Sequence, residues 1–112
     1  EAYIYINETK LQRVIDNTLT NAIKYTLADE VIEVKLVTMG GFVDVSVASK
    51  SKVIEDKERV FEDFYREESD DNGFGIGLRL VKSICDEEGV LIFLDSTNAV
   101  TTFRYRFKMM GR

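Results

Sequence analysis

Two separate groups of residues in this sequence have the types and spacing to hold a phosphate-bearing ligand. Residues 73–82 read Gly-Phe-Gly-Ile-Gly-Leu-Arg-Leu-Val-Lys, and Asn17 and Asn21 lie far upstream of them. Glycines allow backbone N–H groups to approach phosphate oxygens at the start of a helix. Asparagine side chains offer oxygen ligands to a magnesium ion that is also bound by those phosphates. Together the two groups predict a nucleotide site that is divided between two distant parts of the chain.

The asparagine pair lies in a stretch whose apolar residues recur at helical spacing. Thr9 and Gln12 have the spacing of a capping box, and the pattern predicts a helix over residues 10–27. The polar residues of this helix that share a sector of about 100° beside the apolar stripe are Asn17, Asn21, Lys24 and Tyr25. Their position predicts that they line the rim of a pocket.

The remaining elements supply a sheet and a second long helix. Residues 31–38 and 42–48 alternate apolar and polar side chains on either side of Gly40 and Gly41, which predicts a hairpin, and a polar stretch over 49–57 follows. The other predicted elements are a strand at 3–6, a short helix at 60–64, a helix at 76–88 and closing strands at 90–95 and 101–108. This order predicts an α+β fold, a two-layer sandwich in which a mixed, mostly antiparallel sheet packs on about three helices.

The composition excludes several classes of function. The net charge of −5 argues against nucleic acid as a partner, and no apolar run approaches the ~20 residues of a membrane span. The chain has no histidine, so it contains no histidine base, metal ligand or phosphoacceptor. The lone cysteine, Cys85, lies on the apolar side of a helical pattern, which favours a buried side chain over a redox role. Because the first residue is Glu rather than Met, we expect residues 1–112 to be one domain of a longer protein.

Three stretches resemble, in the correct order, the motifs of one family. Residues 11–25 resemble the N box of sensor histidine kinases, residues 60–66 their F box, and residues 73–82 their G2 box. The resemblance implies a Bergerat-type ATP-binding catalytic domain that transfers the γ-phosphate of Mg-ATP to a histidine on a separate helical dimerisation domain. A response regulator would then receive the phosphate. The resemblance also implies the cytoplasmic domain of an inner-membrane sensor protein.

The resemblance implies a role for each matching residue. Asn21 would ligate magnesium, Asn17 would contact the phosphates, Lys24 would reach phosphate and Tyr25 would stack near adenine. The further ATP-binding residues that it implies are Ser49, Ile54, Gly73, Gly75, Ile76, Gly77 and Leu78. For Lys24 a solvated side chain, and for Tyr25 an aromatic at the edge of the core, remain the alternatives. No catalytic residue is expected within this chain, because the phosphoacceptor histidine lies outside it.

One motif of the family is altered. The G1 box, Asp-x-Gly-x-Gly-Ile, aligns best with residues 49–54, so Ser49 stands where the family has the aspartate that receives the adenine amino group. A hydroxyl lacks the charge that roughly doubles the strength of such a hydrogen bond. The loop over residues 67–72 is short and acidic, which disfavours an anionic nucleotide. A degenerate, non-catalytic binding module is therefore the second hypothesis for this domain.

A third hypothesis is a relative that hydrolyses ATP by itself. Such relatives place a glutamate four residues before the magnesium-binding asparagine, where it acts as the base for water. Asn17 occupies that position here. Because a neutral amide cannot accept a proton from water, the sequence disfavours an autonomous ATPase. The same feature disfavours a serine kinase of the anti-sigma-factor type.

Overall fold

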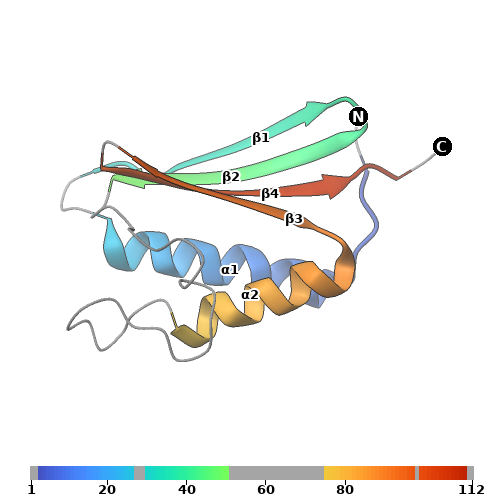
Figure 1. Ribbon diagram of the computed structural model, residues 1–112, viewed down its shortest axis with the longest axis horizontal. Coiled ribbons are helices and arrows are strands. Elements are labelled where there is room, and N and C mark those ends of the chain that lie inside the picture. The colour runs from blue at the N-terminus through green and yellow to red at the C-terminus, as the bar shows by residue number, and fades with distance from the viewer. Residues whose placement is uncertain (1–2, 27–29, 51–74, 98, 111–112) are drawn as a thin grey trace.

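The computed structural model describes residues 3–26, 30–50, 75–97 and 99–110, which form two layers (Figure 1). A four-stranded sheet is one layer, and two helices that cover one of its faces are the other. The elements are α1 (Glu8–Tyr25), β1 (Glu33–Met39), β2 (Phe42–Lys50), α2 (Gly75–Glu88), β3 (Leu91–Thr97) and β4 (Val100–Lys108). The predicted two-layer α+β fold is confirmed, while the short helix expected at 60–64 lies outside the described residues. Neither described helix is long and apolar enough to cross a membrane.

The sheet has the order β1-β2-β4-β3, and each described pair of neighbouring strands is antiparallel. The predicted hairpin turn is confirmed, since Gly40 and Gly41 have φ angles of 52° and 89°, a region that favours glycine. Gly89, with φ of 72°, follows the last residue of α2 as the predicted stop signal.

The core lies between the helices and the inner face of β2 and β4. Alternate residues of β4 point toward the helices, and of these Tyr105 has no exposed surface. The buried hydrophobic residues that pack together are Val14, Val43, Val45, Leu78, Val81, Ile84, Cys85, Val90, Phe103, Tyr105 and Phe107. Burying one large aliphatic or aromatic side chain stabilises the fold by about 1.5–3 kcal/mol, so this cluster is the main source of stability.

Cys85 lies within this core, as the sequence predicted. Its side chain is fully buried, and burial raises the pKa of the thiol to about 12. A thiol that stays protonated at neutral pH is a poor nucleophile and a poor metal ligand. Cys85 is therefore a packing residue.

The helices run in opposite directions, and an ion pair joins them at one end. Lys10 Nζ, near the start of α1, lies 2.7 Å from Glu87 Oε1 and 2.8 Å from Glu88 Oε2, at the end of α2. The hydrogen bonds that Lys10 donates to both carboxylates raise the pKa of Lys10. The end of α1 and the start of α2 consequently lie together at the opposite end of the molecule (Figure 1).

Two predictions about the N-terminal part of the chain are wrong. The cap of α1 is Asn7, whose Oδ1 accepts a hydrogen bond from Lys10 N at 3.2 Å, so the helix begins before Thr9. Asparagine is at least as good a cap as threonine, so Asn7 can take the position that the spacing predicted for Thr9. The strand expected at 3–6 is reduced to one isolated bridge between Ile4 and Met109, because the chain turns into the cap directly afterwards.

The first strand is exposed more than its pattern predicts. Val34 and Leu36 share the inner face with Val47 and Val45, their partners on β2, yet they are 56% and 70% exposed. β1 is an edge strand, and α1 packs on β2 while α2 packs on β3. The apolar alternation of β1 therefore gives the direction of its side chains but not their burial.

A charged cluster lies on the outer face of the sheet, which neither described helix covers. Arg106 Nε and Nη2 each lie 2.8 Å from an oxygen of Asp44, whose side chain is only 7% exposed. The Arg106 guanidinium also lies 5.5 Å from the ring centroid of Phe42 and 5.1 Å from that of Phe93. The hydrogen bonds from Arg106 hold the pKa of the Asp44 carboxyl below its ordinary value of 3.8.

We predict that Asp44→Asn lowers the free energy of unfolding at pH 7 by roughly 1.5–3 kcal/mol, the contribution of a hydrogen bond to a charged group. Because the pKa of Asp44 is lowered by folding, its contribution is complete above pH 3.8 and is lost as the pH falls through the folded-state pKa. The difference between wild type and variant in urea unfolding should therefore shrink below about pH 4. Asp95→Asn, which changes an exposed carboxylate on the same face, is the control. A difference that does not depend on pH would contradict this account.

Candidate functional site

The asparagine pair lies on α1 with its amide groups tied to the helix. Asn17 Nδ2 donates to the Arg13 carbonyl oxygen at 2.7 Å, and Asn21 Nδ2 donates to the Asn17 carbonyl oxygen at 2.8 Å. Asn21 is 8% exposed, and Asn17 is half-buried. Since each NH₂ group is used within the helix, the side-chain oxygen is left to accept or to ligate. The two residues stand one helical turn apart, so their oxygens can serve the same ligand.

Lys24 and Tyr25 belong to the last turn of α1. Their side chains lie outside the described part of the structure, so their predicted roles stay predictions. The same holds for Ile54 and Gly73, which are outside the described residues altogether.

The glycine-rich stretch contributes the start of α2. The helix begins at Gly75, and its first turn consists of Gly75, Ile76, Gly77 and Leu78. The first four N–H groups of a helix lack acceptors within it, and this first turn holds no acidic side chain. The Leu78 side chain is fully buried in the core, which leaves only its backbone amide for a ligand. This end of α2 therefore presents a partial positive charge to an anion.

Ser49 lies in the sheet, where the sequence predicted the start of a polar stretch. Strand β2 continues to Lys50 because Ser49 and Lys50 pair with Thr101 and Val100 of β4. Ser49 is 8% exposed. On β3, Ser96 is the partner of Thr101, and its Oγ lies 2.9 Å from Thr101 Oγ1.

These three residues form a hydroxyl row, Ser49–Thr101–Ser96, across three adjacent strands. Sequence reasoning missed Thr101 and Ser96. Thr101 could have been found, because it continues inward the alternation that includes Phe103 and Tyr105. Ser96 could not, because its place in the row depends on the register of β3 against β4.

The structure brings the described parts of the predicted site to one end of the molecule. The C-terminal end of α1, the start of α2, the ends of β2 and β3 and the start of β4 all lie there (Figure 1). Amide oxygens, helix N–H groups that lack acceptors within the helix, and buried hydroxyls therefore occur together. Oxygen ligands suit magnesium, N–H groups suit phosphate, and hydroxyls suit the polar edge of a base.

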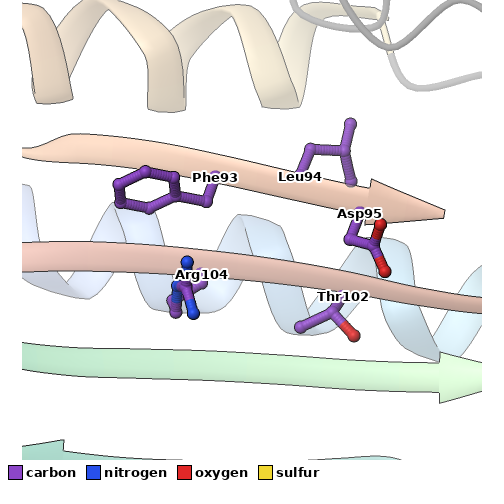
Figure 2. Close-up of a pocket in the computed structure, with 5 residues that line it drawn as sticks. All are labelled: Phe93, Leu94, Asp95, Thr102 and Arg104. Carbon is purple, nitrogen blue, oxygen red and sulfur yellow. The ribbon is translucent and has the colours of Figure 1, made fainter.

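A separate hollow of about 370 Å³ lies on the outer face of the sheet (Figure 2). Figure 2 shows Phe93 and Arg104 on one side of it and Asp95 and Thr102 on the other, with α1 behind the strands. The Arg104 guanidinium carbon is 4.6 Å from the ring centroid of Phe93. Because this hollow is on the opposite side of the sheet from α1, it is distinct from the predicted nucleotide site.

Comparison with known proteins identifies relatives of this chain. Residues 6–110 match the family model described as histidine kinase-, DNA gyrase B- and HSP90-like ATPase. The chain is 34% identical over 120 residues to the heme sensor protein HssS of Staphylococcus saprophyticus, covering 95% of this chain and 24% of that protein. It is 33% identical over 106 residues to the sensor protein VanS of Enterococcus faecium, covering 90% of this chain and 28% of that protein. The chain thus spans about a quarter of the length of these relatives.

Solved structures share the fold. The mycobacterial sensor histidine kinase MprB matches with a TM-score of 0.84 and 22% identity, covering 97% of this chain and 78% of that one. The catalytic domain of histidine kinase ThkA, in a nucleotide-free form, matches with a TM-score of 0.81 and 24% identity, covering 94% and 70%. Full-length ShkA in complex with AMPPNP matches with a TM-score of 0.81 and 22% identity, covering 100% and 24%.

Proposed function

Because this chain belongs to the family of histidine kinase-, DNA gyrase B- and HSP90-like ATPases, we propose that it binds Mg-ATP and directs the γ-phosphate to a histidine outside the chain. The observation that carries the proposal is the arrangement of Asn17 and Asn21, whose NH₂ groups bond to the helix backbone. This arrangement fits magnesium, which accepts one protein oxygen beside phosphate and water oxygens. The ion would neutralise the negative charge of the phosphates, and Asn21 would be its protein ligand.

The first turn of α2 would hold the phosphates. Gly75, Gly77 and the backbone of Leu78 supply N–H groups at a helix start without a competing carboxylate. Phosphoryl transfer depends on positioning and charge neutralisation more than on covalent participation of the protein. Residues that orient the phosphates on a rigid helix therefore suffice for the part of the reaction that this chain would perform.

Ser49 would meet the base, with Thr101 beside it. Ser49 and Lys50 are the described residues of the altered G1 box, and Ser49 lies on the row that also holds Ser96. A hydroxyl can both donate and accept, whereas a carboxylate only accepts. The site would therefore bind adenine more weakly, and with less discrimination, than a site with aspartate at this position.

The proposed partners follow from the same function. A helical, histidine-bearing dimerisation domain of the same protein would receive the phosphate, and a response regulator would take it from there. The chain would then be the cytoplasmic catalytic domain of a two-component sensor protein. The second candidate is a non-catalytic binding module of the same fold, and the neutral Ser49 is the observation that favours it. An autonomous ATPase is disfavoured because Asn17 cannot act as a base.

The metal assignment predicts the effect of one substitution. Asn21→Ala should weaken binding of a non-hydrolysable ATP analogue at least tenfold in magnesium and less than twofold in EDTA, because only the metal contact is lost. Isothermal titration calorimetry under both conditions measures this, with Thr20→Ala, an exposed neighbour on α1, as the control. Equal losses with and without magnesium would reject Asn21 as the metal ligand.

The absence of histidine from the sequence predicts where phosphate can appear. Incubation of this chain alone with radiolabelled ATP should leave no acid-labile phosphate on it. Label should appear when a histidine-bearing dimerisation domain from the same protein is added, and it should appear on that domain. Acid-labile phosphate on the isolated chain would contradict the proposed transfer. Nucleotide binding without any transfer in the mixture would favour the non-catalytic module.

The assignment of Ser49 to the base predicts a gain of affinity. Ser49→Asp should add a charge-assisted hydrogen bond to the adenine amino group, with a net gain of roughly 1 kcal/mol, or about fivefold for ATP. Affinity for GTP, which lacks that amino group, should not increase. Ser46→Asp adds the same charge to the outer face of β2 and should change neither affinity. If Ser49→Asp also changes neither, while Asn21→Ala still weakens binding, Ser49 does not contact the base.

A further inference from the structure

A buried hydrogen bond joins α1 to the centre of the sheet. Thr18 Oγ1 lies 2.6 Å from the Tyr105 hydroxyl oxygen, and neither residue has exposed surface. Thr18 Oγ1 also donates to the Val14 carbonyl oxygen at 2.8 Å. Because a threonine hydroxyl has a single proton, the Tyr105 hydroxyl must be the donor of the shared bond. The result is a directed chain of two hydrogen bonds from β4 to the backbone of α1.

This contact constrains the helix differently from the apolar packing around it. Apolar side chains in a helix–sheet interface tolerate small rotations, because dispersion contacts are individually weak and have no direction. A buried hydroxyl pair tolerates little movement, because separation leaves a buried polar group without a partner. Such a loss lowers the equilibrium constant for folding several-fold. The Thr18–Tyr105 bond therefore fixes the rotation of α1 about its own axis.

The rotation of α1 determines the direction of the asparagine oxygens. Asn17 precedes Thr18 by one residue, and Asn21 follows it by three. At about 100° per residue, both asparagines are therefore displaced from Thr18 in the same direction around the helix axis. Side-chain atoms lie about 5 Å from the axis of a helix, and a rotation of about 10° therefore moves them by about 1 Å. Magnesium requires oxygen ligands at about 2.0–2.1 Å in near-ideal geometry, so a movement of that size removes a ligand.

We propose that Thr18 and Tyr105 are positioning residues, which orient Asn17 and Asn21 toward the magnesium–phosphate group of the bound nucleotide. This inference rests on the proposed function. Neither residue would touch the nucleotide, and the effect of both would pass through the rotation of α1. A contact with a structural role alone would change the stability of the fold but not the metal dependence of binding.

Tyr105→Phe is the most informative variant. It removes one oxygen, keeps the ring in the core and leaves the Thr18 hydroxyl bonded to Val14. Affinity for a non-hydrolysable ATP analogue should fall about fivefold in magnesium and less than twofold in EDTA. Thr18→Val removes the hydroxyl of the other residue in the bond and should cause the same magnesium-specific loss of affinity. Thr18→Ser keeps the hydroxyl and should retain wild-type affinity. Calorimetry measures the affinities, and thermal unfolding confirms that each variant is folded.

Phe107→Leu is the matched control for stability. Phe107 is 3% exposed, lies on the same strand and faces the same core, but it forms no hydrogen bond to α1. It should lower the melting temperature at least as much as Tyr105→Phe without changing the magnesium dependence. In the protein without nucleotide, Tyr105→Phe should shift the side-chain amide resonances of Asn17 and Asn21, and Phe107→Leu should not.

The outcomes separate this inference from the proposed function. If the wild type binds the analogue in magnesium and Asn21→Ala disrupts that binding, but Tyr105→Phe behaves like Phe107→Leu, the positioning role is wrong and the proposed function stands. If the wild type shows no magnesium-dependent binding, the proposed function fails and the positioning role is overturned with it. A magnesium-specific loss in both Tyr105→Phe and Thr18→Val, with rescue by Thr18→Ser, supports the inference.

Discussion

The packing of α1 and α2 on one face of the sheet is the constraint on which the other features of this domain depend. Strand β4 turns its aromatic residues toward the helices, and this single face supplies the core. Because both described helices cover the same face, the two sides of the sheet carry different chemistry. The inner side ends in buried hydroxyls beside the ends of the helices, and the outer side carries the Asp44–Arg106 cluster. Because the two helices on the inner face are antiparallel, the end of α1 and the start of α2 lie at the same end of the molecule.

Those parts of the fold that depend on near neighbours in the sequence could be predicted. The hairpin at Gly40 and Gly41 and the end of α2 at Gly89 depend on residues that accept positive φ angles. The inward side of β4 follows from the alternation of Phe103, Tyr105 and Phe107. The cap of α1 was misassigned because two competent residues, Asn7 and Thr9, stand two positions apart and local rules do not choose between them.

Features that depend on the register of distant strands could not be predicted. Asp44 and Arg106 meet only because β2 pairs with β4 in one register, across 62 residues of sequence. The same register keeps Ser49 within β2, although the sequence after it is polar. In the candidate site, the asparagine pair could be proposed from the sequence because both residues occupy one helix. The inward direction of Thr101 follows from the alternation of β4, whereas the place of Ser96 beside it depends on strand pairing and could not be predicted.

The candidate site also separates two kinds of contact that a nucleotide requires. The groups suited to metal and phosphate come from two helices, while the groups suited to a base come from the end of the sheet. Under the proposed function, Ser49 replaces the aspartate of the family, and this replacement weakens only the contact with the base. Such a contact is the same in the ground state and the transition state, so its loss raises the concentration of ATP that is needed without slowing the transfer itself. A weak base contact is thus compatible with an intact reaction, because the asparagines and the first turn of α2 do not depend on it.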